Sequence, residues 1–300
     1  LLSTDFFIPM RQLGSFFHIA MNGMAASDKI FSILDLPEPE DGEKTLPAGP
    51  LDVALWDVHF SYEADREILK GIDLCLSAGS FVSLVGGSGC GKSTVAGILG
   101  GRNRGYSGSV TVGVIPLSQV REEELMKRVV LVRSNSYLFK GTVEENLKMA
   151  KPDATKEEME AVLQKVNLQG FLETQAGLQT QLLEKAANLS GGQCQRLAIA
   201  RALLRREASV YIFDEAASNI DVESEALIME VIHELAKTKT VLLISHRLAN
   251  VVQSDKIYFL RDGEIQESGT HEALMAAKGA YSRLFDSQMV LECYGKGGVA

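Results

Sequence analysis

One segment, residues 81–99, constrains the fold of this chain more than any other. The nearly continuous apolar run Phe81–Val85 leads into Gly86-Gly87-Ser88-Gly89-Cys90-Gly91-Lys92-Ser93-Thr94, which fits the pattern G-x-x-x-x-G-K-[ST], and an apolar helical pattern follows. Glycines let consecutive backbone N–H groups turn toward one phosphate, and the helix N-terminus adds partial positive charge. We expect Lys92 to bridge the β- and γ-phosphates of a nucleotide and the Ser93 hydroxyl to bind Mg²⁺. The segment therefore predicts a phosphate-binding loop in an α/β fold.

Two further apolar runs end in polar residues that suit the same chemistry. Val210–Phe213 is followed by Asp214 and Glu215, and Thr240–Ile244 is followed by a serine and His246. Such short runs are typical of buried strands in a largely parallel sheet, whose carboxyl ends meet at one ligand-binding edge. We expect Asp214 to hold the Mg²⁺ shell, Glu215 to orient or deprotonate the attacking water, and His246 to contact the γ-phosphate.

The pentapeptide Leu189-Ser190-Gly191-Gly192-Gln193, with Arg196 and Ala-Arg-Ala-Leu after it, resembles the signature motif of ABC ATPases. The resemblance covers residues 51–285. It implies an α/β P-loop NTPase core of the ABC ATPase type, with a mostly parallel sheet, an antiparallel β subdomain and a helical signature subdomain at about residues 140–205. In that helical stretch, Thr155 with Glu158 three residues later predicts the capped start of a helix.

The same resemblance implies roles for individual residues and a partner. Tyr62 matches the aromatic residue that stacks on adenine, Gly86–Thr94 the Walker A loop, and Asp214 the Walker B aspartate. Glu215 matches the catalytic carboxylate, His246 the switch histidine and Ser218-Asn219-Ile220-Asp221 the D-loop. The family forms head-to-tail dimers in which Ser190, Gly191, Gly192 and Gln193 of one domain close over the ATP held by another domain.

The sequence departs from the usual exporter pattern at three places. Ser134 stands where most exporters have a glutamine, which puts Mg²⁺ coordination and coupling to a membrane domain in doubt. Leu182–Ala186 replaces a more glycine-rich stretch, and Cys194 stands where arginine or lysine is common. Because Cys90 and Cys194 are both expected near ATP sites, we hypothesise that thiol modification blocks activity.

The N-terminal segment has two readings, and one of them attaches the chain to a membrane domain. Residues 1–36 are rich in Phe, Leu, Ile and Met, with a break expected at Pro9 and a helical pattern after it. This pattern fits an amphipathic helix packed on a core, or the cytoplasmic end of a truncated transmembrane helix. Residues 37–50, with their prolines, predict an unpacked linker, and 286–300 form a tail without a readable signal. Because the chain starts at Leu1, without a methionine, we expect a fragment of a longer protein.

The N-terminal segment from Asp5 to Asp35 resembles the stretch that joins the last transmembrane helix to the ATPase in single-chain exporter halves. Together with Tyr137–Val143, it looks most like the bacterial thiol-exporter subunits linked to cytochrome bd assembly. The resemblance implies ATP hydrolysis that powers export of a solute across the bacterial inner membrane. The domain would then lie at the cytoplasmic face, with a transmembrane domain of the same chain as partner.

Composition supports this reading and leaves two alternatives. The net charge of -9 argues against a general nucleic-acid binder, and the 4 cysteines form no CxxC pair, as expected for a reducing compartment. The first alternative is a soluble ABC ATPase that works on DNA or ribosomes. The second is a weakly hydrolysing regulatory half of a heterodimeric exporter, which Ser134 suggests. Neither the cargo nor the choice between homodimer and heterodimer follows from the sequence.

Overall fold

The computed structural model describes residues 2–36, 41–63, 65–217 and 220–296. Contacts divide the chain into two compact units, Leu1–Glu40 and Asp41–Ala300.

The first unit is a single helix, α1 (Leu2–Leu34), with Pro9 inside it. The break expected at Pro9 is therefore wrong: a proline removes one backbone hydrogen bond, and the turns on either side continue the helix. Large apolar side chains from Phe7 to Leu36 are 48% to 69% exposed. In the part of the chain that the structure describes, no helix is long and apolar enough to cross a membrane.

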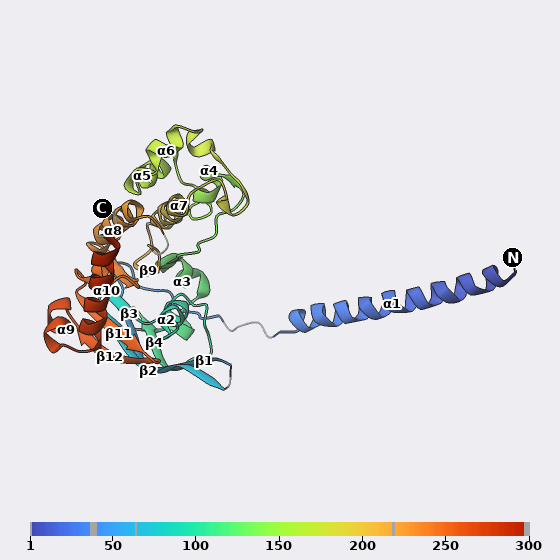
Figure 1. Ribbon diagram of the computed structural model, residues 1–300, viewed down its shortest axis with the longest axis horizontal. Coiled ribbons are helices and arrows are strands. Elements are labelled where there is room, and N and C mark those ends of the chain that lie inside the picture. Colours follow the sequence, from blue (N-terminus) through green and yellow to red (C-terminus); the bar gives the residue numbers. More distant parts are fainter. Residues whose placement is uncertain (1, 37–40, 64, 218–219, 297–300) are drawn as a thin grey trace. The chain divides into compact units, whose positions relative to one another are not determined.

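The second unit is built on three sheets (Figure 1). The largest has six strands in the order β12-β11-β3-β10-β9-β6, and all neighbouring pairs are parallel except β11 with β12. A four-stranded antiparallel sheet has the order β2-β1-β4-β5, and β7 pairs with β8. The strand bounds are β1 Val53–Glu63, β2 Arg66–Leu76, β3 Phe81–Gly86, β4 Ser107–Val112, β5 Ile115–Pro116, β6 Val129–Arg133, β7 Gly141–Thr142, β8 Gln181–Leu182, β9 Val210–Asp214, β10 Thr240–Ile244, β11 Lys256–Arg261 and β12 Glu264–Gly269.

Helices surround these sheets, and α4 to α7 gather at one end of the unit, away from the β1–β2 hairpin (Figure 1). The helix bounds are α2 Lys92–Leu99, α3 Glu122–Arg128, α4 Val143–Lys148, α5 Lys156–Lys165, α6 Gln169–Glu173, α7 Gly191–Leu203, α8 Val222–Ala236, α9 His271–Ala277 and α10 Ala280–Lys296, with short 3-10 turns at Leu117–Gln119, Gly177–Gln179, Glu184–Ala186 and Leu248–Val251. The predicted capping box at Thr155 is confirmed, because its side chain and that of Glu158 each accept the other residue's N–H. The architecture confirms the predicted α/β class with parallel, antiparallel and helical parts.

The parallel strands are buried on both faces, which explains their continuous apolar runs. Along β3, Phe81 and Val85 join one core cluster, whereas Val82 and Leu84 join the other. Strands β9 and β10 alternate in the same way. Side chains that alternate across a strand therefore fill two cores, one toward α2 and the antiparallel sheet and one toward α7 and α8.

Two predicted segments differ from the structure. In the predicted linker, Leu46 is buried and the Lys44 N–H donates to the Gln119 carbonyl over 2.9 Å, so residues 41–50 are not an unpacked linker. Burial of Leu46 packs this segment against the domain, and the prolines in the sequence did not predict that contact. Residues 286–296 of the expected tail lie within α10, where Gln288 donates to the His246 carbonyl and accepts from the Leu248 N–H, and residues 297–300 lie outside the described residues.

Candidate nucleotide-binding site

The glycine loop between β3 and α2 has the backbone that its sequence predicts. Gly86, Gly89 and Gly91 have φ values of 152°, 76° and 111°. A Cβ on Gly86 would lie 2.0 Å from the Leu260 carbonyl oxygen, so only glycine fits there. Gly91 is also the N-cap of α2 and supplies no capping side chain, which leaves the first N–H groups of the helix available to an anion.

Lys92 lies inside this loop. Its Nζ donates to the carbonyls of Gly86 over 3.0 Å and Gly87 over 2.7 Å, and the side chain is buried. The Cys90 Sγ is 3.8 Å from the same Nζ. The buried ammonium of Lys92 donates to neutral carbonyl oxygens here. An anion such as a phosphate would form a stronger hydrogen bond with it.

Ser93 and Asp214 form the candidate metal site. The Ser93 hydroxyl donates to Asp214 Oδ1 over 3.0 Å, and this aspartate is buried at the end of β9. Burial raises the pKa of Asp214, and the charge of Glu215 raises it further, against the Ser93 hydrogen bond and the charges of Arg133 and Lys92. A hydroxyl and a carboxylate are oxygen ligands that suit Mg²⁺, so the residues present fit this ion. Among the described residues, no cluster of three His, Cys, Asp or Glu side chains could hold a metal alone.

Glu215 and His246 meet at the ends of the neighbouring strands β9 and β10. The His246 Nε2 lies 2.5 Å from Glu215 Oε1, and both side chains are partly exposed. Glu215 has φ 54°, and its N–H donates to the Ile244 carbonyl over 3.0 Å. The structure therefore brings together the two residues that were predicted to act on water and on the γ-phosphate.

Tyr62 lies beside the start of α2. Its hydroxyl is 3.3 Å from Thr94 Oγ1 and accepts a hydrogen bond from Asn103 Nδ2 over 3.1 Å. The ring is in a T-shaped contact with Phe60 and the residue remains 62% exposed, which leaves room for a flat ligand to stack on the ring. Asn103 had no distinguishing sequence signal, because its role depends on a contact across the fold.

The predicted signature segment begins α7. Ser190 is the N-cap: its hydroxyl accepts from the Gln193 N–H over 3.2 Å, and Gln193 Oε1 accepts from the Ser190 N–H over 2.9 Å. Gly191 is exposed, whereas Gly192 is buried against α8, where an added Cβ would lie 2.5 Å from Ser224 Oγ. Of the predicted D-loop, Ser218 and Asn219 lie outside the described residues.

Arg133 is a neighbour of the site that sequence reasoning did not single out. It pairs in register with Asp214 at the ends of β6 and β9, and its Nε lies 3.9 Å from Asp214 Oδ2. Only the order of strands in the sheet brings these two residues together. The signal available in the sequence was its position directly before Ser134.

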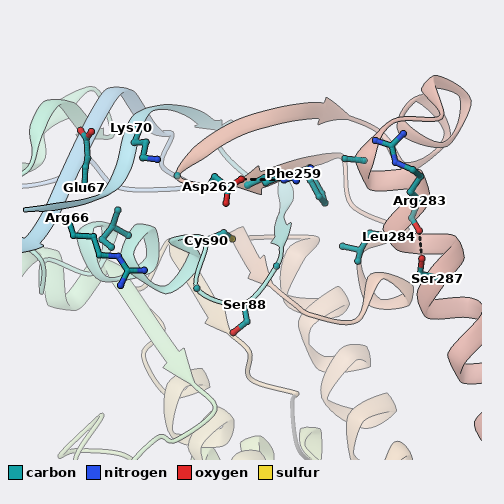
Figure 2. Close-up of a pocket in the computed structure, with 16 residues that line it drawn as sticks. Arg66, Glu67, Lys70, Ser88, Cys90, Phe259, Asp262, Arg283, Leu284 and Ser287 are labelled. Carbon is teal, nitrogen blue, oxygen red and sulfur yellow. Dashed lines mark hydrogen bonds and ion pairs between the residues drawn. The ribbon is translucent and has the colours of Figure 1, made fainter.

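A cavity of about 870 Å³ adjoins the glycine loop. Figure 2 shows Ser88 and Cys90 between Arg66 and Lys70 on one side and Arg283 from α10 on the other. Arg261 also lines this cavity, and so do the acidic residues Glu67 and Asp262. The walls beside the loop are therefore more basic than the chain as a whole, which favours the approach of anions.

Comparison with known proteins decides the family. Residues 69–218 match the model of the ABC transporter family, and this range contains the glycine loop, the signature segment and Asp214-Glu215. The chain belongs to this family. It is an ABC ATPase domain, and Tyr62 and His246 lie outside the range of the match.

The relatives of this ABC ATPase domain include exporters. It is 48% identical over 294 residues to an "Uncharacterized ABC transporter ATP-binding protein" of Haemophilus influenzae, covering 97% of this chain and 52% of the relative. It is 36% identical over 285 residues to an "ATP-dependent lipid A-core flippase" of Chromobacterium violaceum, covering 94% of this chain and 49% of the relative. A bacterial Atm1-family ABC exporter with ATP bound superposes with a TM-score of 0.81 at 29% identity, over 95% of this chain and 50% of the other. The chain thus spans about half the length of these relatives.

Proposed function

We propose that this ABC ATPase domain uses Mg-ATP to power export of a solute through an attached transmembrane domain at the cytoplasmic face of a bacterial inner membrane. The observation that carries the proposal is the meeting of two pairs at adjoining strand ends: Ser93 with Asp214 at 3.0 Å, and Glu215 with His246 at 2.5 Å. Both pairs lie at the carboxyl edge of the sheet from which the glycine loop leaves.

Each residue then has one task. Lys92 exchanges its two carbonyl partners for phosphate oxygens, and Ser93 and Asp214 hold Mg²⁺, which when bound neutralises charge on the phosphates. Glu215, held by His246, orients the attacking water and accepts its proton. Tyr62 offers its ring to adenine, and Ser190–Gln193 closes over the ATP held by a second ABC domain.

A groove supports the proposed membrane partner. It has a volume of about 620 Å³ and is lined by β6, the turn after it and α7. Tyr137 and Phe139 line it with their rings packed edge-on at 4.8 Å and about half exposed, and Met126 and Met149 are also exposed there. Exposed aromatic and methionine side chains around a groove are typical of a docking surface for another protein segment.

The exposed apolar side chains of α1 support the same partner. A helix with large apolar residues 48% to 69% exposed lowers its free energy when another apolar surface covers it. We infer that α1 continues into a transmembrane domain. The narrower prediction, a thiol-exporter subunit linked to cytochrome bd assembly, rests on the sequence resemblance of residues 5–35 and 137–143.

The test is to express the natural gene product in bacteria and extract the membranes with alkaline carbonate. We expect the protein to stay in the membrane, and the detergent-solubilised protein to hydrolyse ATP in a Mg²⁺-dependent reaction that Lys92→Ala abolishes. Release by carbonate with ATPase activity in the soluble fraction would favour a soluble ABC ATPase. A protein that stays in the membrane but hydrolyses ATP only with a different partner chain would favour the regulatory half of a heterodimer.

A further inference from the structure

The side chain of Arg133 points to the Mg²⁺ side of the sheet. Residues Val129 and Leu131 of β6 pack toward α2, in the same cluster as Val210 and Ile212 of β9. Because side chains alternate along a strand, Arg133 and its register partner Asp214 project from that same face. The Arg133 Nε lies 3.9 Å from Asp214 Oδ2, while Oδ1 accepts from Ser93.

The backbone around Arg133 is fixed from both sides. Its carbonyl accepts from Gln195 Nε2 over 3.1 Å and from Ser136 Oγ over 2.9 Å, and the next N–H, of Ser134, donates to the Asp214 carbonyl over 3.1 Å. The Arg133 Nε is buried and, among the described residues, has no hydrogen-bond partner. A buried N–H without an acceptor costs free energy, so a small approach to Asp214 Oδ2 is favourable.

Ser134, the residue after Arg133, would not supply a ligand to a metal at Ser93 and Asp214. Its side chain is exposed and too short to reach a metal held by Ser93 and Asp214 in the way a glutamine would. The sequence resemblance implies a glutamine at this position, so a metal bound by Ser93 and Asp214 would have one protein ligand fewer here. Metal affinity would then depend more strongly on how the Asp214 carboxylate is oriented. Side chains that orient a metal ligand contribute to the affinity of the site.

We propose that Arg133 is a positioning residue for Asp214, and that it compensates for the missing glutamine at position 134. The Nε–H donates to Oδ2 when Mg-ATP binds, which keeps Oδ1 directed toward Ser93 and the metal. The guanidinium acts through Asp214 and does not coordinate the ion. This inference rests on the proposed binding of Mg-ATP.

The test measures how much Mg²⁺ strengthens nucleotide binding. A fluorescent ATP analogue is titrated into the 300-residue chain in EDTA and in Mg²⁺, and Mn²⁺ binding to the ATP complex is followed by electron paramagnetic resonance. In Arg133→Met we expect affinity in EDTA to stay at the wild-type value. The Mg²⁺-dependent gain and the Mn²⁺ affinity should each fall about tenfold, as expected for one lost charge-assisted hydrogen bond.

Two further variants make the test specific. Arg205→Met removes another arginine of the neighbouring groove, one that donates to the Met126 carbonyl, and should leave the Mg²⁺-dependent gain unchanged. Adding Ser134→Gln to Arg133→Met should restore the gain, because glutamine can reach the metal. Arg133→Lys, which keeps the charge but lacks the Nε–H, should lose part of the gain and replaces the Met variant if that one unfolds.

A wild-type gain in Arg133→Met, or an equal loss in EDTA and in Mg²⁺, would overturn the positioning role. Failure of Ser134→Gln to restore any gain would overturn the compensation. A wild-type chain that binds ATP equally with and without Mg²⁺ would instead contradict the proposed Mg-ATP function itself.

Discussion

At the scale of single residues, Asp214 shows how stability and function oppose one another. Its carboxyl group is buried, and burial raises its pKa. A raised pKa means that the carboxyl group loses its proton less readily in the folded chain than in the unfolded chain. The ionised carboxylate therefore lowers the free energy of unfolding at neutral pH. In the proposed function, this charge is the one that would hold Mg²⁺.

Asp214→Asn should therefore stabilise the nucleotide-free protein while abolishing the Mg²⁺-dependent gain in ATP affinity. The asparagine oxygen can still accept from Ser93, and the unfolding midpoint at pH 7 should rise by about 2–4 °C, the shift expected for about 1 kcal/mol. The rise should shrink as the pH falls and the wild-type carboxyl group becomes protonated. Asp153→Asn, at an exposed position, is the control and should change nothing. A lower midpoint for Asp214→Asn in calorimetry would contradict this account.

The two half-buried cysteines should respond differently to alkylation. Cys90 lies in the glycine loop beside Lys92, so an added group there occupies the space that phosphate needs. Burial raises the pKa of the Cys194 thiol, which leaves less reactive thiolate. We expect N-ethylmaleimide to block ATP binding in wild type and in Cys194→Ser, ATP to protect both, and Cys90→Ser to resist the reagent. Mass spectrometry that shows complete alkylation of Cys90 with unchanged ATP turnover would rule out the thiol hypothesis.

At the scale of elements, α4, α5 and α7 begin with the same reciprocal pair of cap hydrogen bonds. Ser190 with Gln193 caps α7, and Thr155 with Glu158 caps α5, each by a reciprocal pair of hydrogen bonds. Replacing either N-cap with alanine should cost about 1 kcal/mol of stability. Because only the α7 start is proposed to meet ATP on a second domain, Ser190→Ala should also lose most ATPase activity, whereas Thr155→Ala should keep it. Parallel denaturant unfolding and ATPase assays decide this, and equal activity in the two variants would remove Ser190 from the site.

The elements also show which parts of the fold a sequence reveals. Strands β3, β9 and β10 were predictable because local apolar runs end in glycine or polar residues. The pairing of β6 with β9 depends on tertiary order, and so the Arg133–Asp214 contact was missed. The short β7–β8 pair joins residues just before α4 to residues between α6 and α7, and it has no local signal.

At the scale of the whole molecule, charge is distributed unevenly. The net charge is -9, yet four cationic side chains and two carboxylates line the cavity beside the glycine loop. A local basic region on an acidic protein attracts ATP without favouring nucleic acid in general. The distribution explains how an acidic chain can carry a polyphosphate site.

A complete ATP site is expected to need two chains. The start of α7 is exposed at Ser190 and Gly191, and the first helical N–H groups, from Gly191 on, suit an anion, while the glycine loop presents a second set. Two chains placed head to tail would join these sets over one ATP, and Glu215→Gln should keep that complex from hydrolysing. We expect light scattering to show this variant shift with Mg-ATP from 32.6 kDa to twice that mass, and to show no shift when Lys92→Ala is added. A Glu215→Gln chain that binds Mg-ATP and stays monomeric would mean that a different chain, or the membrane domain, must complete the site.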